Sequence, residues 1–373
     1  MPRQATPGPL VPYGSTRQGG ADVGTASDPE QVGLKGTASV RREDVIGFRV
    51  RAQHLHRRLP ATSRHRAARC GLPDGAPRSA VLSLHARAGG VGPDDWDDPA
   101  FTQVWGPRGA VYVVAEADVA VFTLGLLPTD GRKRQAAYEA ADAVRDAVGS
   151  RDVRKRDVLG AVGNRVERLL LACTTGRLRV RWDGRDTLVR VTDPPQVDPD
   201  EARRELLRRF LGALGPATVQ GFARWAGLSI VDSRESWRAL TDELVEVTVA
   251  GQGGPAILDA DRAALIDAPQ AGGVRLLPPG DPYLLAADRE LLVPVAAHRR
   301  AIWPAGTVQP GALFVGGELC GTWRRRGHRV EISTWAEVDD AVRAAAEREA
   351  GGFPLALDRD IAVTWVGHSP GSG

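Results

Sequence analysis

Apolar residues recur at helical spacing in some stretches of the chain and alternate with polar residues in others. This pattern predicts one helix over residues 45–55 and a second over residues 77–88, where the apolar side chains share a face. Two β-rich runs within residues 103–114, separated by a Gly-Pro-Arg-Gly turn, predict a hairpin. Residues 116–126 predict an apolar helix, which completes a first block.

A second block repeats this order. Residues 156–172 predict a helix, and residues 178–191 predict a hairpin whose Asp-Gly pair suits a two-residue turn. Arginines alternate with apolar residues along its first strand, so one strand face carries a row of guanidinium groups, namely Arg177, Arg179 and Arg181. Such a row suits a wing that follows phosphates, and its alternative is the solvated outer face of an ordinary hairpin.

A third block shows the clearest order of elements. Helices are predicted over residues 201–214, 219–225 and 231–244, with a glycine turn between the last two and a strand over residues 245–249. Helix, short helix, turn, longer helix and strand is the order of a winged helix-turn-helix. Three such blocks in succession predict tandem winged-helix units.

The remainder of the chain differs in kind. Short β-type runs linked by glycine and proline are predicted at residues 274–277, 291–295, 312–315, 318–323 and 328–332, followed by a helix over residues 336–350. The predicted fold class is α+β, with three tandem winged-helix modules and a small C-terminal β-rich, barrel-like domain. The predicted boundaries are a disordered N-terminal extension over residues 1–39, modules over residues 40–128, 129–198 and 199–270, and the C-terminal domain over residues 271–373.

Composition excludes several classes of protein. The chain has 373 residues, 42% hydrophobic and 25% charged, which are ordinary values for a globular protein of two or three domains. It has no apolar run long enough for a transmembrane helix and no secretory signal, so we expect a cytoplasmic protein that does not enter a membrane. Cys70, Cys173 and Cys320 are too widely spaced to suggest a disulfide framework or a zinc site. No metal or cofactor is expected, because nucleotide-binding and hydrolase motifs are missing from the sequence.

The net charge of +3 conceals a strong segregation of charge. Residues 40–87 carry eleven arginines against three acids, residues 151–190 carry eleven Lys or Arg against five acids, and residues 299–329 carry six arginines against one glutamate. The stretches between these blocks are acidic. Three basic blocks suggest a modular molecule that gathers positive faces on one side, as nucleic-acid binders do. A coding bias toward arginine explains the scarcity of lysine but not the clustering.

Several motifs resemble one family of proteins. The motifs are residues 276–285 (LLPPGDPYLL), 288–292 (DRELL), 317–324 (GELCGTWR), 215–218 (GPAT), 222–228 (FARWAGL) and 108–112 (RGAVY). Together they resemble the tandem winged-helix proteins that include the bacterial AlkZ and YcaQ DNA glycosylases, over residues 43–367. This resemblance implies three winged-helix modules and a C-terminal β-domain that form a concave, basic face for DNA.

The resemblance also implies a chemistry. Characterised members cleave the N-glycosidic bond of bulky N7-alkylated or crosslinked purines, whose positive charge already activates the leaving group. The site then needs to stabilise an oxocarbenium-like sugar and to place a water molecule. In the family a Gln-x-Gln or Gln-x-Asp motif supplies these groups, but here Pro73 and Gly75 occupy its two positions.

Asp74 lies between these two positions and is the nearest carboxylate. It is the candidate general base or electrostatic stabiliser, and the alternative is a solvent-exposed aspartate in a turn. The candidate DNA-binding residues are Arg108, Arg177, Arg179 and Arg181 at the wings, with Arg69, Arg78 and Arg324 lining the cleft. His54 and His56 lie on a predicted basic helix, where a solvated pair is the simpler interpretation.

Two functions therefore remain open. The leading hypothesis is a monomeric, nucleoid-associated winged-helix DNA-binding protein that resembles the glycosylases excising bulky N7-alkylated or crosslinked purines from double-stranded DNA. The other is a non-catalytic DNA-binding regulator or damage-recognition protein, which the residues at positions 73 and 75 favour.

Overall fold

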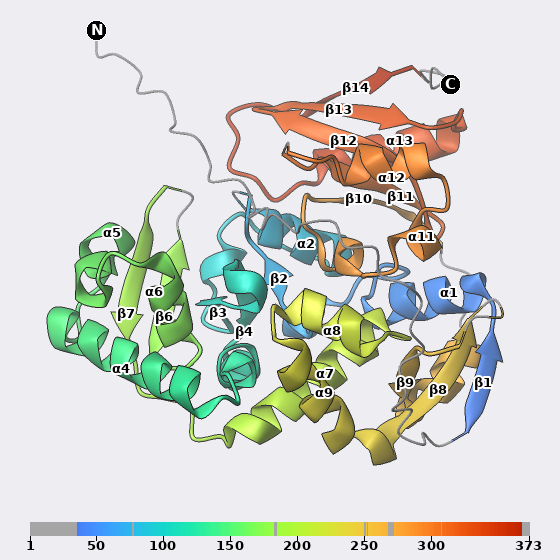
Figure 1. Cartoon of the computed structure of the whole chain (residues 1–373). Helices are drawn as coiled ribbons and strands as arrows, with labels where there is room; N and C mark the ends of the chain where they lie inside the picture. Colours follow the sequence, from blue (N-terminus) through green and yellow to red (C-terminus); the bar gives the residue numbers. More distant parts are fainter. Residues whose placement is uncertain are drawn as a thin grey trace, which may run out of the picture.

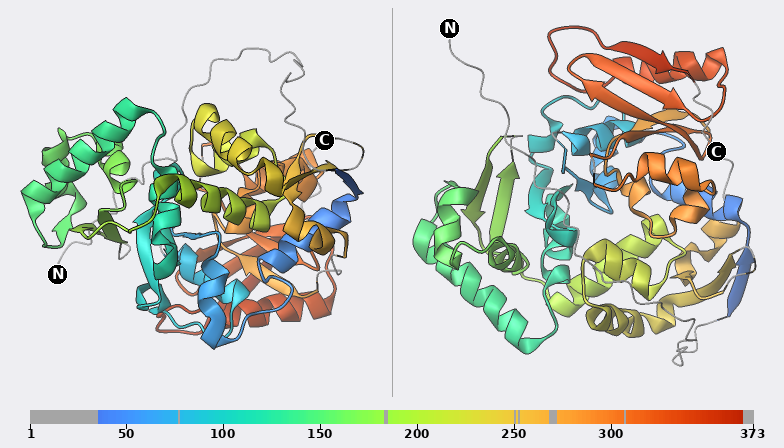
Figure 2. Two further views of the ribbon diagram at one scale, coloured as in Figure 1. Left: turned by 90° about the horizontal axis from the view of Figure 1, so that it is seen from below. Right: turned by 45° about the horizontal axis from the view of Figure 1, so that its top comes forward.

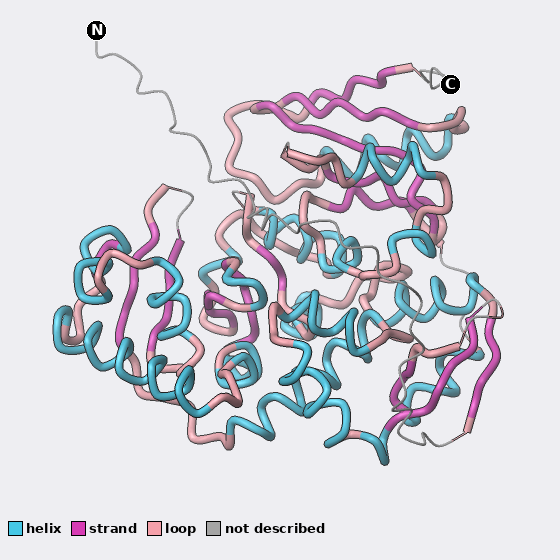
Figure 3. Tube along the Cα trace, viewed as in Figure 1, coloured by secondary structure: helices cyan, strands magenta, loops and turns pink. Residues whose placement is uncertain are grey.

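Helices and strands are mixed along the whole chain (Figures 1 and 3). The structure is a computed structural model that describes residues 36–76, 78–182, 185–249, 251, 253–267, 272–306 and 308–367. It confirms the α+β class and the β-rich C-terminal region.

The two predicted hairpins of the N-terminal half join into one sheet. Its strands, in the order in which they pair, are β2 (Leu72–Pro73), β4 (Val111–Ala115), β3 (Phe101–Trp105), β6 (Leu178–Trp182), β7 (Thr187–Val191) and β5 (Val153–Arg154). Strands β3 and β6 meet where Gln103 lies opposite Val180. The first two predicted modules are therefore joined edge to edge by one six-stranded sheet.

Four helices accompany this sheet, and their bounds are α2 (Ser79–Arg87), α4 (Gly131–Val148), α5 (Lys155–Val158) and α6 (Val166–Cys173). Helix α4 has 18 residues, yet the hydrophobic pattern does not predict it. Most of its buried side chains are alanines, which give only a weak apolar signal. Helices α4 to α6 and hairpin β6–β7 form one side of the molecule, away from the C-terminal sheet (Figures 1 and 2).

Two predicted helices are interrupted. Residues 116–126 form a 3-10 turn, α3 (Val119–Phe122) and a second 3-10 turn, because the chain changes direction at Thr123. The predicted helix over residues 156–172 is divided into α5 and α6 because Gly163 and Asn164 both have positive φ angles, of 70° and 58°. Two consecutive left-handed residues cannot continue an α-helix.

The third block agrees best with its prediction. It contains α7 (Pro199–Leu214), α8 (Val219–Ala226), α9 (Ile230–Ala239), β8 (Leu244–Val249), β9 (Ala256–Leu258) and α10 (Arg262–Ile266). Strand β8 also pairs in parallel with β1 (Thr37–Val40), which leads into α1 (Arg42–Ala52). The assignment of residues 37–39 to a disordered extension is therefore wrong, because their backbone completes this sheet. Residues 1–35 lie outside the described part of the chain.

The C-terminal region is an open sheet packed against helices. Its strands pair in sequence order, namely β10 (Val274–Leu277), β11 (Gly311–Val315), β12 (Glu318–Arg326), β13 (Arg329–Thr334) and β14 (Ala362–Val366). Among the described residues β10 and β14 are its two edges, so the barrel-like prediction is wrong. Its helices are α11 (Arg289–Leu292), α12 (Ala296–Ile302) and α13 (Asp340–Gly351). The strand predicted over residues 291–295 is wrong, because its first two residues end helix α11 and the next three have no regular structure.

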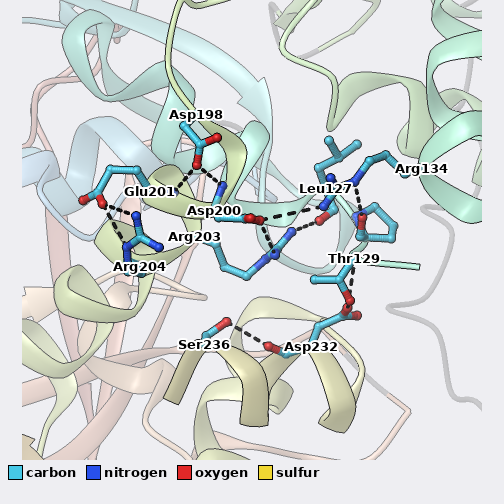
Figure 4. Close-up of polar contacts among 11 residues, drawn as sticks. Leu127, Thr129, Arg134, Asp198, Asp200, Glu201, Arg203, Arg204, Asp232 and Ser236 are labelled. Carbon is cyan, nitrogen blue, oxygen red and sulfur yellow. Dashed lines mark hydrogen bonds and ion pairs between the residues drawn. The ribbon is translucent and has the colours of Figure 1, made fainter. Parts of the chain in front are cut away.

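A polar junction fixes the chain between α3 and α4. The guanidinium of Arg203 on α7 is almost fully buried, and it donates to the carbonyl oxygen of Leu127 and to Asp200. The backbone N–H of Thr129 donates to a carboxylate oxygen of Asp232 on α9 at 3.1 Å. Figure 4 shows these side chains around the segment that contains Leu127 and Thr129 and leads to α4. This junction connects the segment that leads into α4, and with it helices α4 to α6, to the third block.

The largest hydrophobic cluster joins the first block, the third block and the start of the C-terminal region, from Ile46 on α1 to Leu319 on β12. The second block has a cluster of its own around α4, α6 and hairpin β6–β7. A buried ion pair crosses the largest cluster between Arg87 on α2 and Asp281, which follows β10. The two side chains are 1% and 0% exposed, and two pairs of nitrogen and oxygen atoms lie 2.7 Å apart. The first block, the third block and the C-terminal region are therefore packed on one another through a shared core.

Removing one member of this pair should destabilise the fold strongly. We expect Asp281→Leu to lower the free energy of unfolding by about 3–5 kcal/mol, because it leaves the charge of Arg87 buried without its partner. Urea denaturation of the full chain measures this change.

The double variant Arg87→Met/Asp281→Leu should recover much of the loss, because no charge is then left unpaired. Glu167→Gln, in an exposed ion pair with Arg165, serves as a control that leaves the denaturation midpoint in place. A midpoint of Asp281→Leu equal to that of this control would contradict the assigned role.

Candidate functional site

The segment from Leu72 to Ala80 connects one edge of the six-stranded sheet to helix α2. Strand β2 pairs with β4, and the backbone N–H of Asp74 extends this pairing by donating to the carbonyl oxygen of Val111 at 2.8 Å. The hydroxyl of Ser79, the first residue of α2, donates to the carbonyl oxygen of Pro73 at 3.0 Å. Contacts at both ends therefore hold the segment in place.

The side chain of Asp74 is fully buried at the start of α2. The backbone N–H of Ala80 donates to one carboxylate oxygen at 3.1 Å, and the amide of Gln103 donates to the other at 3.3 Å. The guanidinium of Arg78 lies 3.7 Å away. Burial raises the pKa of Asp74 to about 6, although the bond from Ala80 and the charge of Arg78 act in the opposite direction. The interpretation of Asp74 as a solvent-exposed turn residue is therefore wrong.

The two positions that flank Asp74 offer no catalytic side chain. Pro73 is buried in strand β2, and Gly75 is exposed. Neither residue has a carboxylate or an amide group that could hold a water molecule or oppose a positive charge.

Gln103 joins this segment to the second hairpin. Its amide nitrogen donates to the carbonyl oxygen of Trp182 at 3.3 Å, and its amide oxygen accepts from the N–H of Trp182 at 2.5 Å. Arg78 donates to the same carbonyl oxygen at 3.2 Å. The end of β6 therefore lies directly against the environment of Asp74.

Two of the predicted DNA-binding arginines meet at one tryptophan. The guanidinium carbon of Arg78 lies 3.7 Å from the ring centre of Trp96, and that of Arg181 lies 5.0 Å from it. Arg181 also pairs with Asp97 at 2.7 Å. This stacking holds the second hairpin beside the start of α2.

The other two arginines of this row have partners of their own. Arg177 pairs with Asp142 of α4 at 2.7 Å and lies over the ring of Tyr138. Arg179 is half-buried and donates to the carbonyl oxygen of Gly176 at 2.9 Å, and burial lowers the pKa of its guanidinium. Among the three arginines of the row, Arg181 is the most exposed to solvent.

Arg108 belongs to a second group of cations. It occupies the turn of the first hairpin with a φ of 57°. Gly227 packs closely against this turn, since a Cβ atom at Gly227 would lie only 3.0 Å from the backbone of Arg108. The pKa of Arg289 is lowered by burial and then by the charges of Arg224 and Arg108. Three guanidinium groups from separate parts of the chain therefore share one region of positive potential.

A large cavity adjoins this second group. Its volume is about 970 Å³, and it lies between α1, α7, α8, α11 and α12. Its cationic lining residues are Arg42, Arg49, Arg224, Arg289, Arg299 and Arg300. Trp303 also lines it, with the guanidinium of Arg289 4.8 Å from its ring centre.

The remaining two predicted arginines lie elsewhere. Arg69 is exposed and lines a smaller cavity between α1, α7 and residues 65–70. Arg324 is exposed on β12 of the C-terminal sheet and donates to the carbonyl oxygen of Val308 at 3.2 Å. Of the predicted arginines, Arg78 lies with the row of the second hairpin, and Arg108, Arg69 and Arg324 lie at three other positions. They do not form a single patch.

The two candidate histidines follow a helix and do not lie on one. Helix α1 ends at Ala52, and His54 has a φ of 56°. Both imidazoles are half-buried, so their interpretation as a solvated helical pair is wrong. Burial lowers the pKa of His54 to about 4, and the charge of Arg66 acts in the same direction.

Two negative findings apply to the part of the chain that the structure describes. None of its helices is both long enough and apolar enough to cross a bilayer. Nor do three or more of its His, Cys, Asp or Glu side chains gather in a group that could hold a metal ion.

Clustered arginines provide the positive potential that a nucleic-acid-binding protein needs. A family model described as DNA glycosylase AlkZ-like matches residues 67–353, which is most of the chain. The chain belongs to the AlkZ-like DNA glycosylase family, a family of DNA-repair proteins.

Two relatives come from Streptomyces sahachiroi. A protein named interstrand DNA cross-link repair glycosylase is 30% identical over 158 residues, which are 41% of this chain and 42% of that relative. The solved structure of the DNA glycosylase AlkZ is similar with a TM-score of 0.70 at 20% identity, covering 88% of this chain and all of that one. At this identity the structural likeness establishes the fold.

Sequence reasoning missed Arg224, Arg289 and Trp96 as members of the site. Arg224 and Arg289 lie within motifs that carry the family resemblance, but they are 65 positions apart, so only folding places them in one lining. Trp96 stands in an acidic stretch that gives no signal of contact with arginine.

The carboxyl group of Asp74 should take up a proton when the chain folds near pH 5. Its pKa of about 6 exceeds the ordinary value of 3.8, so the stabilisation from its protonated form is complete below about pH 4 and is lost as the pH rises through 6. Asp74→Asn does not titrate and keeps an oxygen that can accept from Ala80. We expect this variant to gain stability relative to the native chain between pH 4 and 7, by about 3 kcal/mol at the upper end.

Urea denaturation at a series of pH values tests this expectation. Above pH 7 the two stability curves should run parallel, which provides an internal control. Curves that are parallel from pH 4 upward would show that the carboxyl of Asp74 ionises as it does in the unfolded chain.

Proposed function

We propose that this chain recognises bulky alkylated or crosslinked purines in double-stranded DNA without hydrolysing them through the family's catalytic segment. Membership of the AlkZ-like family and the name of its cross-link repair relative support the type of DNA target. The observation that carries the proposal is the segment over residues 72–80. It holds a buried proline, a buried aspartate and a glycine at the positions where the resemblance to the family implies the catalytic side chains.

The contacts of Asp74 support a role in building the site. Its carboxylate accepts from the first turn of α2 and from Gln103, and Gln103 in turn holds the end of β6. A general base must reach a water molecule or a substrate atom at hydrogen-bonding distance. A carboxylate that is 0% exposed and already has donors on both oxygens does not meet this condition.

A specific observation favours excision by Asp74 as the second candidate function. Its pKa of about 6 places it in the range in which carboxyl groups act as acid and base near neutral pH. For this function the segment over residues 72–80 has to open so that Asp74 reaches the sugar of the damaged nucleotide.

We propose that three helix-and-hairpin units act as winged-helix modules on DNA. They lie within residues 40–128, 129–198 and 199–270, and their hairpins are β3–β4, β6–β7 and β8–β9. Each hairpin follows helical elements, as the wing of this motif does.

We propose that Arg78, Arg108 and the row of Arg177, Arg179 and Arg181 contact phosphates. On binding, the ion pairs of Arg177 and Arg181 exchange carboxylates for phosphate oxygens. Arg69 and Arg324, both exposed, are further phosphate contacts outside this group. A single copy of the chain would supply this face and would associate with the nucleoid through DNA.

Neutralising the row should weaken the salt dependence of binding. Each phosphate contact contributes a slope of about 0.9 in log K against log salt, so Arg177→Ala/Arg179→Ala/Arg181→Ala should flatten the slope by about 2 to 3. Fluorescence anisotropy with a labelled duplex at several salt concentrations measures the slope.

Arg348→Ala/Arg359→Ala is the matched control, because both arginines are exposed in the C-terminal region, away from the row. Its slope should equal that of the native chain. An unchanged slope in the triple variant would remove the row from the interface.

A single-turnover assay separates recognition from excision. The substrate is a duplex with one N7-alkylguanine, treated with heat or alkali to reveal abasic sites, and binding is followed in parallel. We expect tight, salt-sensitive binding without release of the base, and the same result for Asp74→Asn. Release by the native chain that Asp74→Asn abolishes would instead establish the second candidate function.

A further inference from the structure

The smaller cavity lies on other faces of α1 and α7 than the larger one. Its volume is about 510 Å³. Helix α1 contributes Arg51 to it but Arg49 to the larger cavity, and helix α7 contributes Arg209 to it but Phe210 to the larger one. The two helices therefore form the wall between two separate cavities.

The lining of the smaller cavity is strongly cationic. Its basic side chains are Arg51, Arg66, Arg69, Arg87, Arg209, His54 and His65, against the two carboxylates of Asp118 and Asp261. Asp118 forms an ion pair with Arg209, in which a guanidinium nitrogen lies 2.9 Å from a carboxylate oxygen. Arg87 is paired with Asp281 behind the lining, so Arg51, Arg66 and Arg69 are left with the single carboxylate of Asp261.

Arg66 and Arg69 hold the unbalanced charge. Both are exposed, and among the described residues neither guanidinium has a hydrogen-bonded or ion-paired partner. Burial lowers the pKa of His54 to about 4, and the charges of Arg66, His56, Arg87 and Arg69 act in the same direction. His54 is therefore neutral near pH 7 and can accept a hydrogen bond. The charges of Arg69 and Arg51 also act on the carboxyl of Asp261, whose pKa they lower against the effect of burial.

The cavity also has a fixed floor. Gln53 and Arg87 line it and are 5% and 1% exposed. The amide of Gln53 donates to the carbonyl oxygen of Ala213 at 3.1 Å and accepts from Arg87 at 2.9 Å. Such a floor is set before any ligand arrives, which lowers the entropic cost of binding.

We propose that this cavity binds a phosphate monoester, either the terminal phosphate of a DNA strand or a free mononucleotide. A guanidinium group can donate two parallel hydrogen bonds to the oxygens of one phosphate group. The two negative charges of a phosphate monoester would neutralise the positive charges of Arg66 and Arg69. A volume of about 510 Å³ is typical of small-ligand sites, so it admits a terminal group or a nucleotide but not an intact duplex. This site is separate from the row of Arg177, Arg179 and Arg181 proposed for duplex binding, and Arg69 is the one proposed phosphate contact that also lines it.

Titration calorimetry of the full chain at constant ionic strength tests this proposal. The probes are inorganic phosphate, deoxyadenosine 5′-monophosphate, and a short duplex with either a 5′-phosphate or a 5′-hydroxyl. We expect the phosphate-bearing probe to bind in one-to-one ratio, and Arg66→Ala/Arg69→Ala to weaken its binding at least tenfold. Arg57→Ala is the matched control, since Arg57 is exposed in the same stretch but does not line the cavity.

The probes distinguish the two sources of phosphate. A preference for the 5′-phosphorylated duplex over the hydroxyl form assigns a DNA end, and binding of the free phosphates alone assigns a small-molecule ligand. The Arg177→Ala/Arg179→Ala/Arg181→Ala variant should retain this binding, so failure of the duplex face and failure of this site are separable. Equal binding by Arg66→Ala/Arg69→Ala and the native chain, or no heat with any phosphate probe, overturns the proposal.

Discussion

The ion pair between Arg87 and Asp281 connects the start of the chain to its C-terminal third. Both groups lose their hydration, so the pair is stable only because further bonds satisfy it. Arg87 also donates to Ser83 and Gln53, and Asp281 accepts from Ser83 and Tyr283. Helices α1 and α2 and the loop after β10 are thereby fixed to one another. This pairing explains physically why the stretch over residues 276–285 carries a buried aspartate.

Helix α2 is held at both of its ends by buried polar groups. Asp74 accepts from its first turn, and Arg87, its last residue, is fixed by Asp281. The segment over residues 72–80 therefore stands between a sheet edge and a helix that cannot easily shift. The family resemblance implies a catalytic motif in this stretch, whereas the structure holds the stretch as a joint between sheet and helix, and this is the physical basis for proposing recognition ahead of hydrolysis.

The distribution of arginine follows from the packing of α1 and α7. These two helices divide the cationic residues between a large cavity, lined by Arg224 and Arg289 among others, and a smaller one lined by Arg66 and Arg69. The basic blocks in the sequence predict that positive charge is concentrated, but they do not predict that it faces two separate spaces. The net charge of a sequence segment does not show which cavity each arginine faces, because neighbouring side chains on a helix point in different directions.

The sequence by itself determined the local elements with strong periodicity, such as α7 and hairpin β3–β4, the α+β class and the family, because short-range patterning and ordered motifs carry that information. It did not predict α4, whose buried alanines give little contrast, or β1, which is stable only as a partner of β8. Only the tertiary structure decided the environment of Asp74, since its burial depends on Gln103 and on the end of β6. Burial and pKa are set by neighbours distant in the chain, so a single sequence cannot specify them.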